Sequence, residues 1–189
     1  MADRRIVKAV LDACVLYPAP VRDILLSFAN EGLYQPKWSD QIQDEWIRNL
    51  LIKRPDLKRE QLKRLAKTMD TAFPDANVQG FESRIRLIEL PDRDDRHVVA
   101  AALESESDLI ITFNLRDFPL NQLDGFGMEA NHPDDFLVGL FKTDEYRGSQ
   151  AFEKQLKRLK NPPIDSAQLL QILKKAGLPK TATILKNKR

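Results

Sequence analysis

The fold is decided by a short apolar run that ends in an acid, Ile6-Val7-Lys8-Ala9-Val10-Leu11-Asp12. Its β-branched residues and its length predict a buried strand over residues 6–11. The chain then breaks at Pro18 and Pro20. A charged residue directly after a buried strand, and ahead of more apolar residues, is costly unless it is used. Asp12 is therefore the first candidate site residue.

Strands alternate with helices in the residues that follow. The apolar patterns predict further strands over residues 84–90 and 109–112, and a short one near residues 126–130. Helices are predicted over residues 21–30, 58–69, 92–106 and 133–141, with another that Ser39 or Asp40 caps. This alternation predicts an α/β/α sandwich with a mostly parallel central sheet.

Two more helices, over residues 151–159 and 166–176, are predicted beyond this body. We therefore expect one domain over residues 1–142 and a basic helical C-terminal extension over residues 143–189. Residues 151–189 carry ten Lys and Arg against two acids, a net charge of +8, whereas the first 150 residues have a net charge of −6. A polyanionic partner and a solvated terminus explain this charge equally well.

Composition excludes several classes of protein. The chain has 189 residues, 42% hydrophobic and 31% charged, as in an ordinary globular protein. It contains no long apolar segment or secretory signal, so we expect a cytoplasmic protein with no membrane partner. One cysteine, Cys14, with His97 and His132 cannot form a Cys/His zinc site. The expected chemistry is carboxylate chemistry or none.

Four acids are expected to converge. Asp12 ends the first strand, Asp95 lies in the first turn of a predicted helix, Asp117 follows the strand over residues 109–112, and Glu45 borders the buried face of its helix. Ligands bind outside the carboxyl ends of parallel strands. Converging carboxylates repel one another unless a cation neutralises them, and oxygen ligands select Mg²⁺ or Mn²⁺. Taken singly, these acids also fit a helix terminus, a turn or a solvated edge.

Four segments, in order, resemble the motifs of the PIN-domain nucleases over roughly residues 6–141. They are Leu11-Asp12-Ala13-Cys14-Val15-Leu16-Tyr17-Pro18, Ser39-Asp40-Gln41-Ile42-Gln43-Asp44-Glu45-Trp46, Pro91-Asp92-Arg93-Asp94-Asp95-Arg96-His97-Val98-Val99-Ala100-Ala101-Ala102 and Thr112-Phe113-Asn114-Leu115-Arg116-Asp117-Phe118-Pro119. The resemblance implies a ribonuclease that depends on Mg²⁺ or Mn²⁺, of the kind found in VapC-type toxins of toxin-antitoxin pairs. It implies RNA as the substrate and an antitoxin protein as a partner.

The resemblance also implies which acids hold the metal and carry out catalysis. They are Asp12, Glu45, Asp95 and Asp117. Asn114 competes with Asp117 for the fourth position, and Asp92 and Asp94 compete with Asp95. Many relatives have asparagine where this chain has Cys14. The difference bears on how Asp12 is positioned, but not on its presence.

Basic residues supply candidates for substrate binding. We expect Arg96 and Arg116 to bind the RNA backbone and His97, one turn into its helix, to support the site. The helix over residues 58–69 has a basic face that suits a nucleic-acid backbone or simply solvent. The basic extension is expected to support substrate binding, antitoxin docking or a homodimer.

Two other functions remain open from the sequence. One is a non-catalytic module that binds RNA or a protein partner, and the other is a metal-dependent phosphohydrolase that acts on small phosphate esters. Metal-dependent cleavage of RNA distinguishes the ribonuclease from both.

Overall fold

The computed structural model describes residues 6–187, which fall into two compact units. We call the first the sheet unit, made of Val7–Tyr17 and Gln35–Asn131, and the second the helical unit, made of residues 18–34 and 132–187. Each unit contains segments that are far apart in the sequence.

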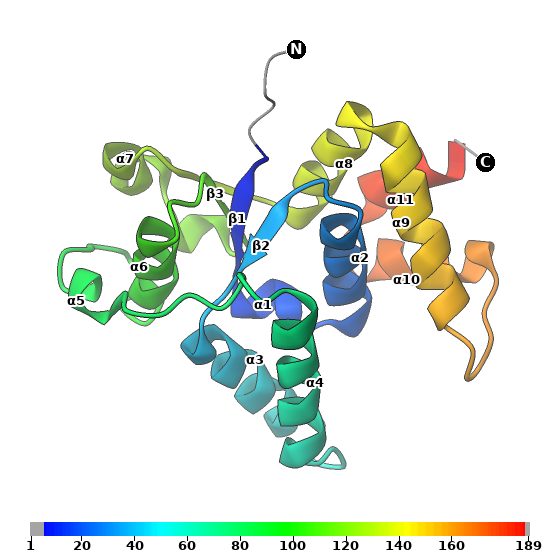
Figure 1. Ribbon diagram of the computed structural model, residues 1–189, viewed down its shortest axis with the longest axis horizontal. Coiled ribbons are helices and arrows are strands. Elements are labelled where there is room, and N and C mark those ends of the chain that lie inside the picture. Colours follow the sequence, from blue (N-terminus) through cyan, green and yellow to red (C-terminus); the bar gives the residue numbers. More distant parts are fainter. Residues whose placement is uncertain (1–5, 188–189) are drawn as a thin grey trace. The chain divides into compact units, whose positions relative to one another are not determined.

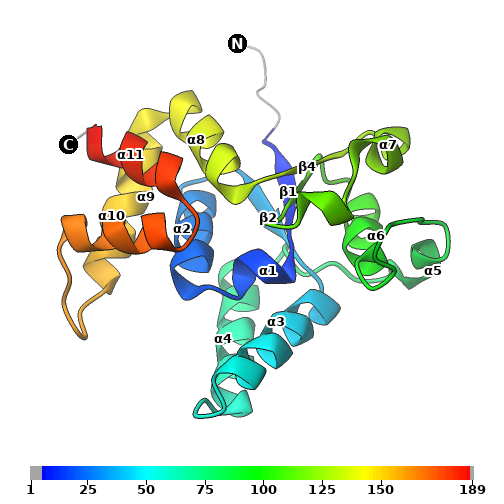
Figure 2. The ribbon, with the colours of Figure 1, turned by 180° about the vertical axis from the view of Figure 1, so that it is seen from behind.

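The sheet unit is built on four parallel strands in the order β2-β1-β3-β4. Figure 1 labels β1, β2 and β3 of this sheet, and Figure 2 labels β4. The strands are β1 (Lys8–Leu11), β2 (Gln35–Lys37), β3 (Leu109–Ile111) and β4 (Glu129–Asn131). In register, Leu11 lies opposite Ile111, and Ile111 lies opposite Asn131. The residues that follow β1 and β3 therefore emerge side by side at one edge of the sheet. The predicted fold class, α/β with a parallel sheet and additional C-terminal helices, is confirmed.

Helices and short 3-10 turns make up the rest of the regular structure of the sheet unit. They are α1 (Ala13–Leu16), α3 (Asp40–Lys53), α4 (Arg59–Ala72), α5 (Glu82–Ile85), α6 (Arg96–Glu104) and α7 (Leu120–Leu123), with single 3-10 turns η1 (Leu115–Asp117) and η2 (Asp124–Phe126). Helix α6 packs on β1 and β3. Its small residues Val98–Ala102 are fully buried, because short side chains allow close approach to a sheet.

Helix α3 begins where the sequence predicts. The side chain of Ser39 accepts a hydrogen bond from the backbone of Ile42 and so caps the helix. Ile42 and Trp46 are fully buried. The buried stripe fixes the rotation of α3, and this rotation leaves Glu45 half-buried at the border of the core.

The predicted strand over residues 84–90 is wrong. The segment forms the short helix α5 and then a chain of turns, with backbone hydrogen bonds from Leu87 to Arg84 and from Ile88 to Ile85. The alternating pattern does not mark one buried face, because Leu87 is 67% exposed while Ile88 is buried. Local turns satisfy the backbone groups that a neighbouring strand would otherwise bond.

One helix boundary and one strand also differ from the predictions. The helix predicted from residue 92 begins only at Arg96, because the carboxylate of Asp92 accepts a hydrogen bond from the backbone of Asp94 and forms a turn. Strand β2 was not predicted from the sequence, since it contains Pro36. As the edge strand of the sheet it needs no second row of backbone bonds.

The helical unit contains α2 (Ala19–Asn30), α8 (Pro133–Thr143), α9 (Glu145–Arg158), α10 (Ser166–Lys175) and α11 (Pro179–Asn187). Helices α9 and α10 both contact α2, as Figure 2 shows from behind. The N-terminus of α11 is tied to α8, because the buried carboxylate of Asp134 accepts hydrogen bonds from the backbone of Lys180 and Thr181. Helix α8 therefore groups with the helices that follow it, and the domain boundary expected after residue 142 stays a prediction.

None of the helices within residues 6–187 is both long enough and apolar enough to cross a membrane.

Candidate active site

The carboxyl edge of the sheet offers a natural binding position. The chain continues from β1 to β2 on one side of the sheet, and from β3 to β4 on the opposite side. The strand order therefore reverses between β1 and β3. Ligand sites of open parallel sheets lie at such a reversal, outside the carboxyl ends of the strands. Asp12 directly follows β1 and Thr112 directly follows β3. The candidate site is therefore centred on the ends of these two strands.

Asp12 is held in place by neighbours from both strands. Its Oδ2 accepts hydrogen bonds from Thr112 Oγ1 at 2.7 Å and from Cys14 Sγ at 3.0 Å. Its side chain makes no capping hydrogen bond to α1, so a helix-capping role does not explain it. Asp12 is 3% exposed, and this burial raises the pKa of its carboxyl group, as does the nearby charge of Glu45.

Cys14 takes part in the same network. Besides bonding Asp12, its sulfur accepts a hydrogen bond from the backbone of Phe113. Burial and the charge of Asp12 raise the pKa of the thiol, so it stays protonated and can donate. Cys14 thus orients Asp12 and links the ends of β1 and β3, and cysteine at this position is compatible with a fixed carboxylate.

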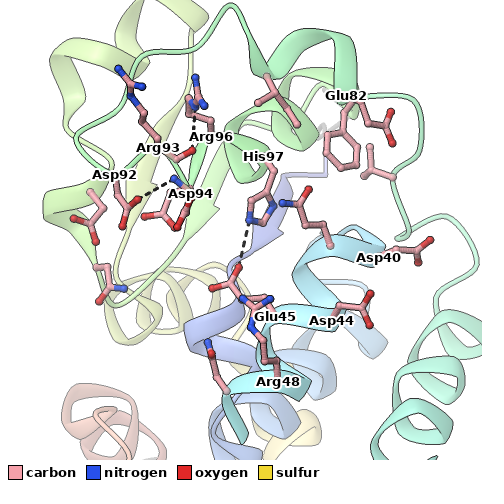
Figure 3. A pocket seen from close by; sticks show the side chains of 18 of the residues that line it. Asp40, Asp44, Glu45, Arg48, Glu82, Asp92, Arg93, Asp94, Arg96 and His97 are labelled. Atoms are coloured by element: carbon pink, nitrogen blue, oxygen red, sulfur yellow. Dashed lines mark hydrogen bonds and ion pairs between the residues drawn. The ribbon is translucent and has the colours of Figure 1, made fainter. Parts of the chain in front are cut away.

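Glu45 reaches the site from α3 and meets a histidine from α6. His97 is buried, and its Nε2 lies 3.3 Å from Glu45 Oε2 (Figure 3). The Nδ1 atom of His97 has no hydrogen-bond partner among the described residues. The contact directs the glutamate carboxylate, so His97 lies beside a candidate ligand and is not exposed at the surface.

The pKa of Asp95 reflects the proximity of the other acids as well as burial. Its pKa is raised to about 7, first by burial and then by the charges of Asp12, Asp92, Glu45 and Asp117. Its side chain makes no capping bond to α6, although it occupies the N-cap position. Acids from four separate segments of the chain thus interact electrostatically at one place.

Two cavities adjoin these acids. The larger, about 970 Å³, is lined by Glu45, Asp95, Asn114 and Asp117, and also by Asp92 and Asp94. The smaller, about 350 Å³, is lined by Asp12, Glu45, Asp95 and Asn114, with Tyr17 and Lys53 beyond them. Because Glu45, Asp95 and Asn114 line both, the cavities meet at these residues. We call the larger one the acid cavity.

The donor chemistry of the acids suits a hard divalent cation. Among residues 6–187, no three His, Cys, Asp or Glu side chains are already gathered closely enough to hold a metal ion. Carboxylate oxygens are nevertheless the ligands that Mg²⁺ and Mn²⁺ prefer. A cation at this place also offsets the repulsion that, after burial, raises the pKa of Asp95.

The two arginines expected to bind substrate differ in position. Arg96 lines the acid cavity, whereas Arg116 is exposed and belongs to the lining of neither cavity as the structure describes them. Asn114 lines both cavities and Asp117 only the larger one, so both alternatives for the fourth position adjoin the site.

Several residues of the site were missed from the sequence. Arg48 and Asn49 follow Glu45 by three and four residues and line the acid cavity. The helical period of α3 could have identified them, because residues at these spacings share a face. No sequence signal marks Thr112 as a partner of Asp12, since the pairing depends on strand register.

Comparisons with known proteins agree with this geometry. The family model described as the PIN domain matches residues 8–116, and the model described as the VapC50 C-terminal domain matches residues 133–187. A protein named putative ribonuclease VapC50, from Mycobacterium tuberculosis (strain ATCC 25618 / H37Rv), is 34% identical over 79 residues. That match covers 42% of this chain and 47% of the relative, so it spans about half of the relative's length. No solved structure matches the chain.

The PIN match covers more than half of the chain and includes the segments that carry Asp12, Glu45 and Asp95. It ends at residue 116, so Asp117 lies just beyond it. With the parallel sheet and the acids at its carboxyl edge, this match shows that the chain belongs to the PIN domain family.

Proposed function

We propose that this chain is a ribonuclease that hydrolyses phosphodiester bonds of RNA with the help of Mg²⁺ or Mn²⁺. The observation that carries the proposal is the meeting of carboxylates around adjoining cavities at the reversal of strand order: one directly after β1, one from α3, one directly before α6 and one from η1. Such a concentration of acids binds cations, and RNA hydrolysis is chemistry that divalent cations support.

We assign the metal to Asp12, Glu45, Asp95 and Asp117. Asn114 and Asp92 stand beside them as further oxygen donors. When bound, the divalent ion neutralises charge at the phosphodiester and lowers the pKa of a water molecule that attacks it. These assignments follow the acids that line the two cavities and interact with Asp95.

The protein's own residues position these groups. Thr112 and Cys14 hold the carboxylate of Asp12, and His97 holds that of Glu45. Arg96 is placed to bind an RNA phosphate from the side of the acid cavity. Arg116 lies outside the cavity lining, so its contact with RNA requires a strand that extends over the surface near η1.

We further propose that the chain acts as the toxin of a type II toxin-antitoxin pair, with an antitoxin protein as its partner. The support is the second match, to a VapC50 C-terminal domain, together with the relative named putative ribonuclease VapC50. The homodimer and the cytoplasmic location expected from the sequence stay predictions.

Asp12→Asn tests the proposed chemistry, because it removes a charge at the centre of the site and keeps the shape of the side chain. We expect wild-type protein to cleave labelled RNA with Mg²⁺ or Mn²⁺ and to stop when a chelator is added. The variant should lose more than roughly 100-fold of this activity, since ligand carboxylates are central to metal catalysis. Asp56→Asn is the matched control, because Asp56 is an exposed acid that pairs with Arg54 away from both cavities.

The same assay separates the other functions. Equal RNA cleavage by wild type and Asp12→Asn contradicts the assigned site. RNA binding without cleavage under any metal favours a non-catalytic module, and hydrolysis of a chromogenic phosphate ester without RNA cleavage favours a phosphohydrolase. A toxin further requires that induced synthesis of the wild type, but not of Asp12→Asn, arrests growth.

A further inference from the structure

A third cavity in the sheet unit, of about 550 Å³, is rich in arginine. Its lining includes Arg86, Arg93, Arg96 and Gln122, and we call it the arginine groove. Glu89 is the acid in this lining, so the groove carries an excess of positive charge. The apolar side chains of Ile88 and Leu90, both buried, complete it.

The arginines of the groove form no ion pair within the described residues. Among residues 6–187, no carboxylate lies within ion-pair distance of Arg86, Arg93 or Arg96. Arg84, two residues before Arg86, differs sharply because it pairs with Glu104 at 2.6 Å. Arg96 donates to the backbone oxygen of Arg93, which holds the two arginines together. Guanidinium groups without a carboxylate partner are suited to bind an anion.

The groove adjoins the acid cavity. Arg93 and Arg96 line both spaces, and Asp95 lies between them in the chain. Figure 3 shows the two arginine side chains side by side, extending away from the carboxylates of Asp92 and Asp94. A strand that enters the acid cavity can therefore continue along these arginines.

A polyanionic substrate needs such a surface. The acids of the site repel RNA, whereas most of the affinity of proteins for nucleic acid comes from basic contacts with phosphates. Gln122 adds a different signal, because its Oε1 is buried without a hydrogen-bond partner among the described residues. An acceptor oxygen cannot bind a phosphate, but once the Gln122 side chain turns toward the groove its oxygen can accept from a ribose hydroxyl.

We propose that the arginine groove binds the RNA strand beside the cleaved bond, with Arg86 and Arg93 on flanking phosphates and Gln122 accepting from a ribose hydroxyl. The proposal rests on the proposed ribonuclease function, because it names where that enzyme holds its substrate. It assigns the affinity for RNA to the arginine groove and not to the basic face of α4.

Equilibrium binding tests the groove. We would titrate fluorescein-labelled single-stranded RNA with full-length Asp12→Asn protein, which should not cleave it, at several salt concentrations. Arg86→Gln and Arg93→Gln should each weaken binding about threefold to tenfold and lower the slope of log affinity against log salt by about 0.7, the value for one phosphate contact with a single strand. Gln122→Met should weaken binding without changing that slope, because it removes no charge.

Two controls locate the effect. Arg84→Gln removes the same charge from the same segment but lies outside the groove, so it should bind RNA as the parent protein does. Lys63→Gln, on the exposed face of α4, should also have little effect. Unchanged affinity and slope in Arg86→Gln and Arg93→Gln overturn the proposal, as does an equal loss in Arg84→Gln.

The outcome is separable from that of the ribonuclease function. RNA binding that depends on Arg86 and Arg93, in a protein whose wild type cleaves no RNA, supports the groove and contradicts the nuclease. Metal-dependent cleavage by the wild type, with no effect of the arginine variants on binding, supports the nuclease and contradicts the groove.

Discussion

Asp95 is the residue at which the electrostatics of the site can be measured. Its pKa is raised to about 7, first by burial and then by four neighbouring acids, against an ordinary value of 3.8. Between these two pH values the folded protein binds a proton that the unfolded chain releases. The free energy of unfolding therefore falls as pH rises from about 4 to about 7.

This sign gives a prediction for the metal-free protein. In chelator, we expect the melting temperature to fall between pH 5 and pH 8, because the ionised Asp95 is buried and is repelled by the other acids. Mg²⁺ should raise the melting temperature more at pH 8 than at pH 5, since the ion binds the ionised site. Thermal melts at both pH values, with and without Mg²⁺, measure the effect.

Asp95→Asn is the control for this pH dependence. The variant has no charge to repel, so its melting temperature in chelator should change less between pH 5 and pH 8. The electrostatic explanation fails if wild type and Asp95→Asn show the same slope, or if Mg²⁺ stabilises the wild type equally at both pH values.

Helices α8 and α9 meet at a contact that a Cβ atom would crowd. A Cβ atom built on Gly148 of α9 would lie 2.5 Å from the ring of Phe141, which is 1% exposed at the end of α8. Gly139 of α8 is also helical, but a Cβ atom there would meet nothing within 4 Å. The two glycines thus differ in packing while they share the same type of backbone.

Replacing each of these glycines with alanine should therefore change the free energy of unfolding in opposite directions. Gly148→Ala should lower the free energy of unfolding by about 1–3 kcal/mol, because the buried ring of Phe141 must move. Gly139→Ala should raise it by about 0.5–1 kcal/mol through helix propensity. Urea denaturation of both variants measures the two changes, and stabilisation by Gly148→Ala would show that the contact relaxes freely.

Elements with strong periodic patterns were predictable from the sequence, and those set by tertiary pairing were not. Residues 109–112 and the buried stripe of Ile42 and Trp46 indicated β3 and α3, because burial on one face leaves a regular pattern. Strand β2 has three residues and contains Pro36, so only its pairing with β1 defines it. The apparent strand over residues 84–90 failed because its alternation had no neighbouring strand to pair with.

The candidate site follows the same division. The candidate acids were proposed from their positions after strands or at the starts of helices, which the sequence pattern indicates, and their roles stay predictions. The hydrogen bond between Thr112 and Asp12 spans 100 residues, and the contact between His97 and Glu45 joins α6 to α3. Neither follows from local pattern, because each depends on register and helix packing.

At the scale of the whole molecule, the helices beyond residue 143 pack with two helices that precede them in the chain. Helices α9, α10 and α11 belong to the helical unit together with α2 and α8. They bury Phe152, Leu169, Leu173, Leu178 and Leu185 there. Each such side chain contributes roughly 1.5–3 kcal/mol when fully buried, whereas a domain has only about 5–15 kcal/mol of net stability.

A chain that ends at Thr143 should therefore lose stability as well as basic charge. We expect it to bind the dye ANS and to melt at a lower temperature and less cooperatively, because α2 and α8 lose the apolar faces that cover them. The matched control keeps the full length and replaces the exposed Lys157, Lys174 and Lys175 with glutamine, which removes charge alone. This control should melt as the wild type does. Cooperative melting of the shortened chain at the wild-type temperature would instead establish residues 143–189 as a separable extension, as the sequence predicts.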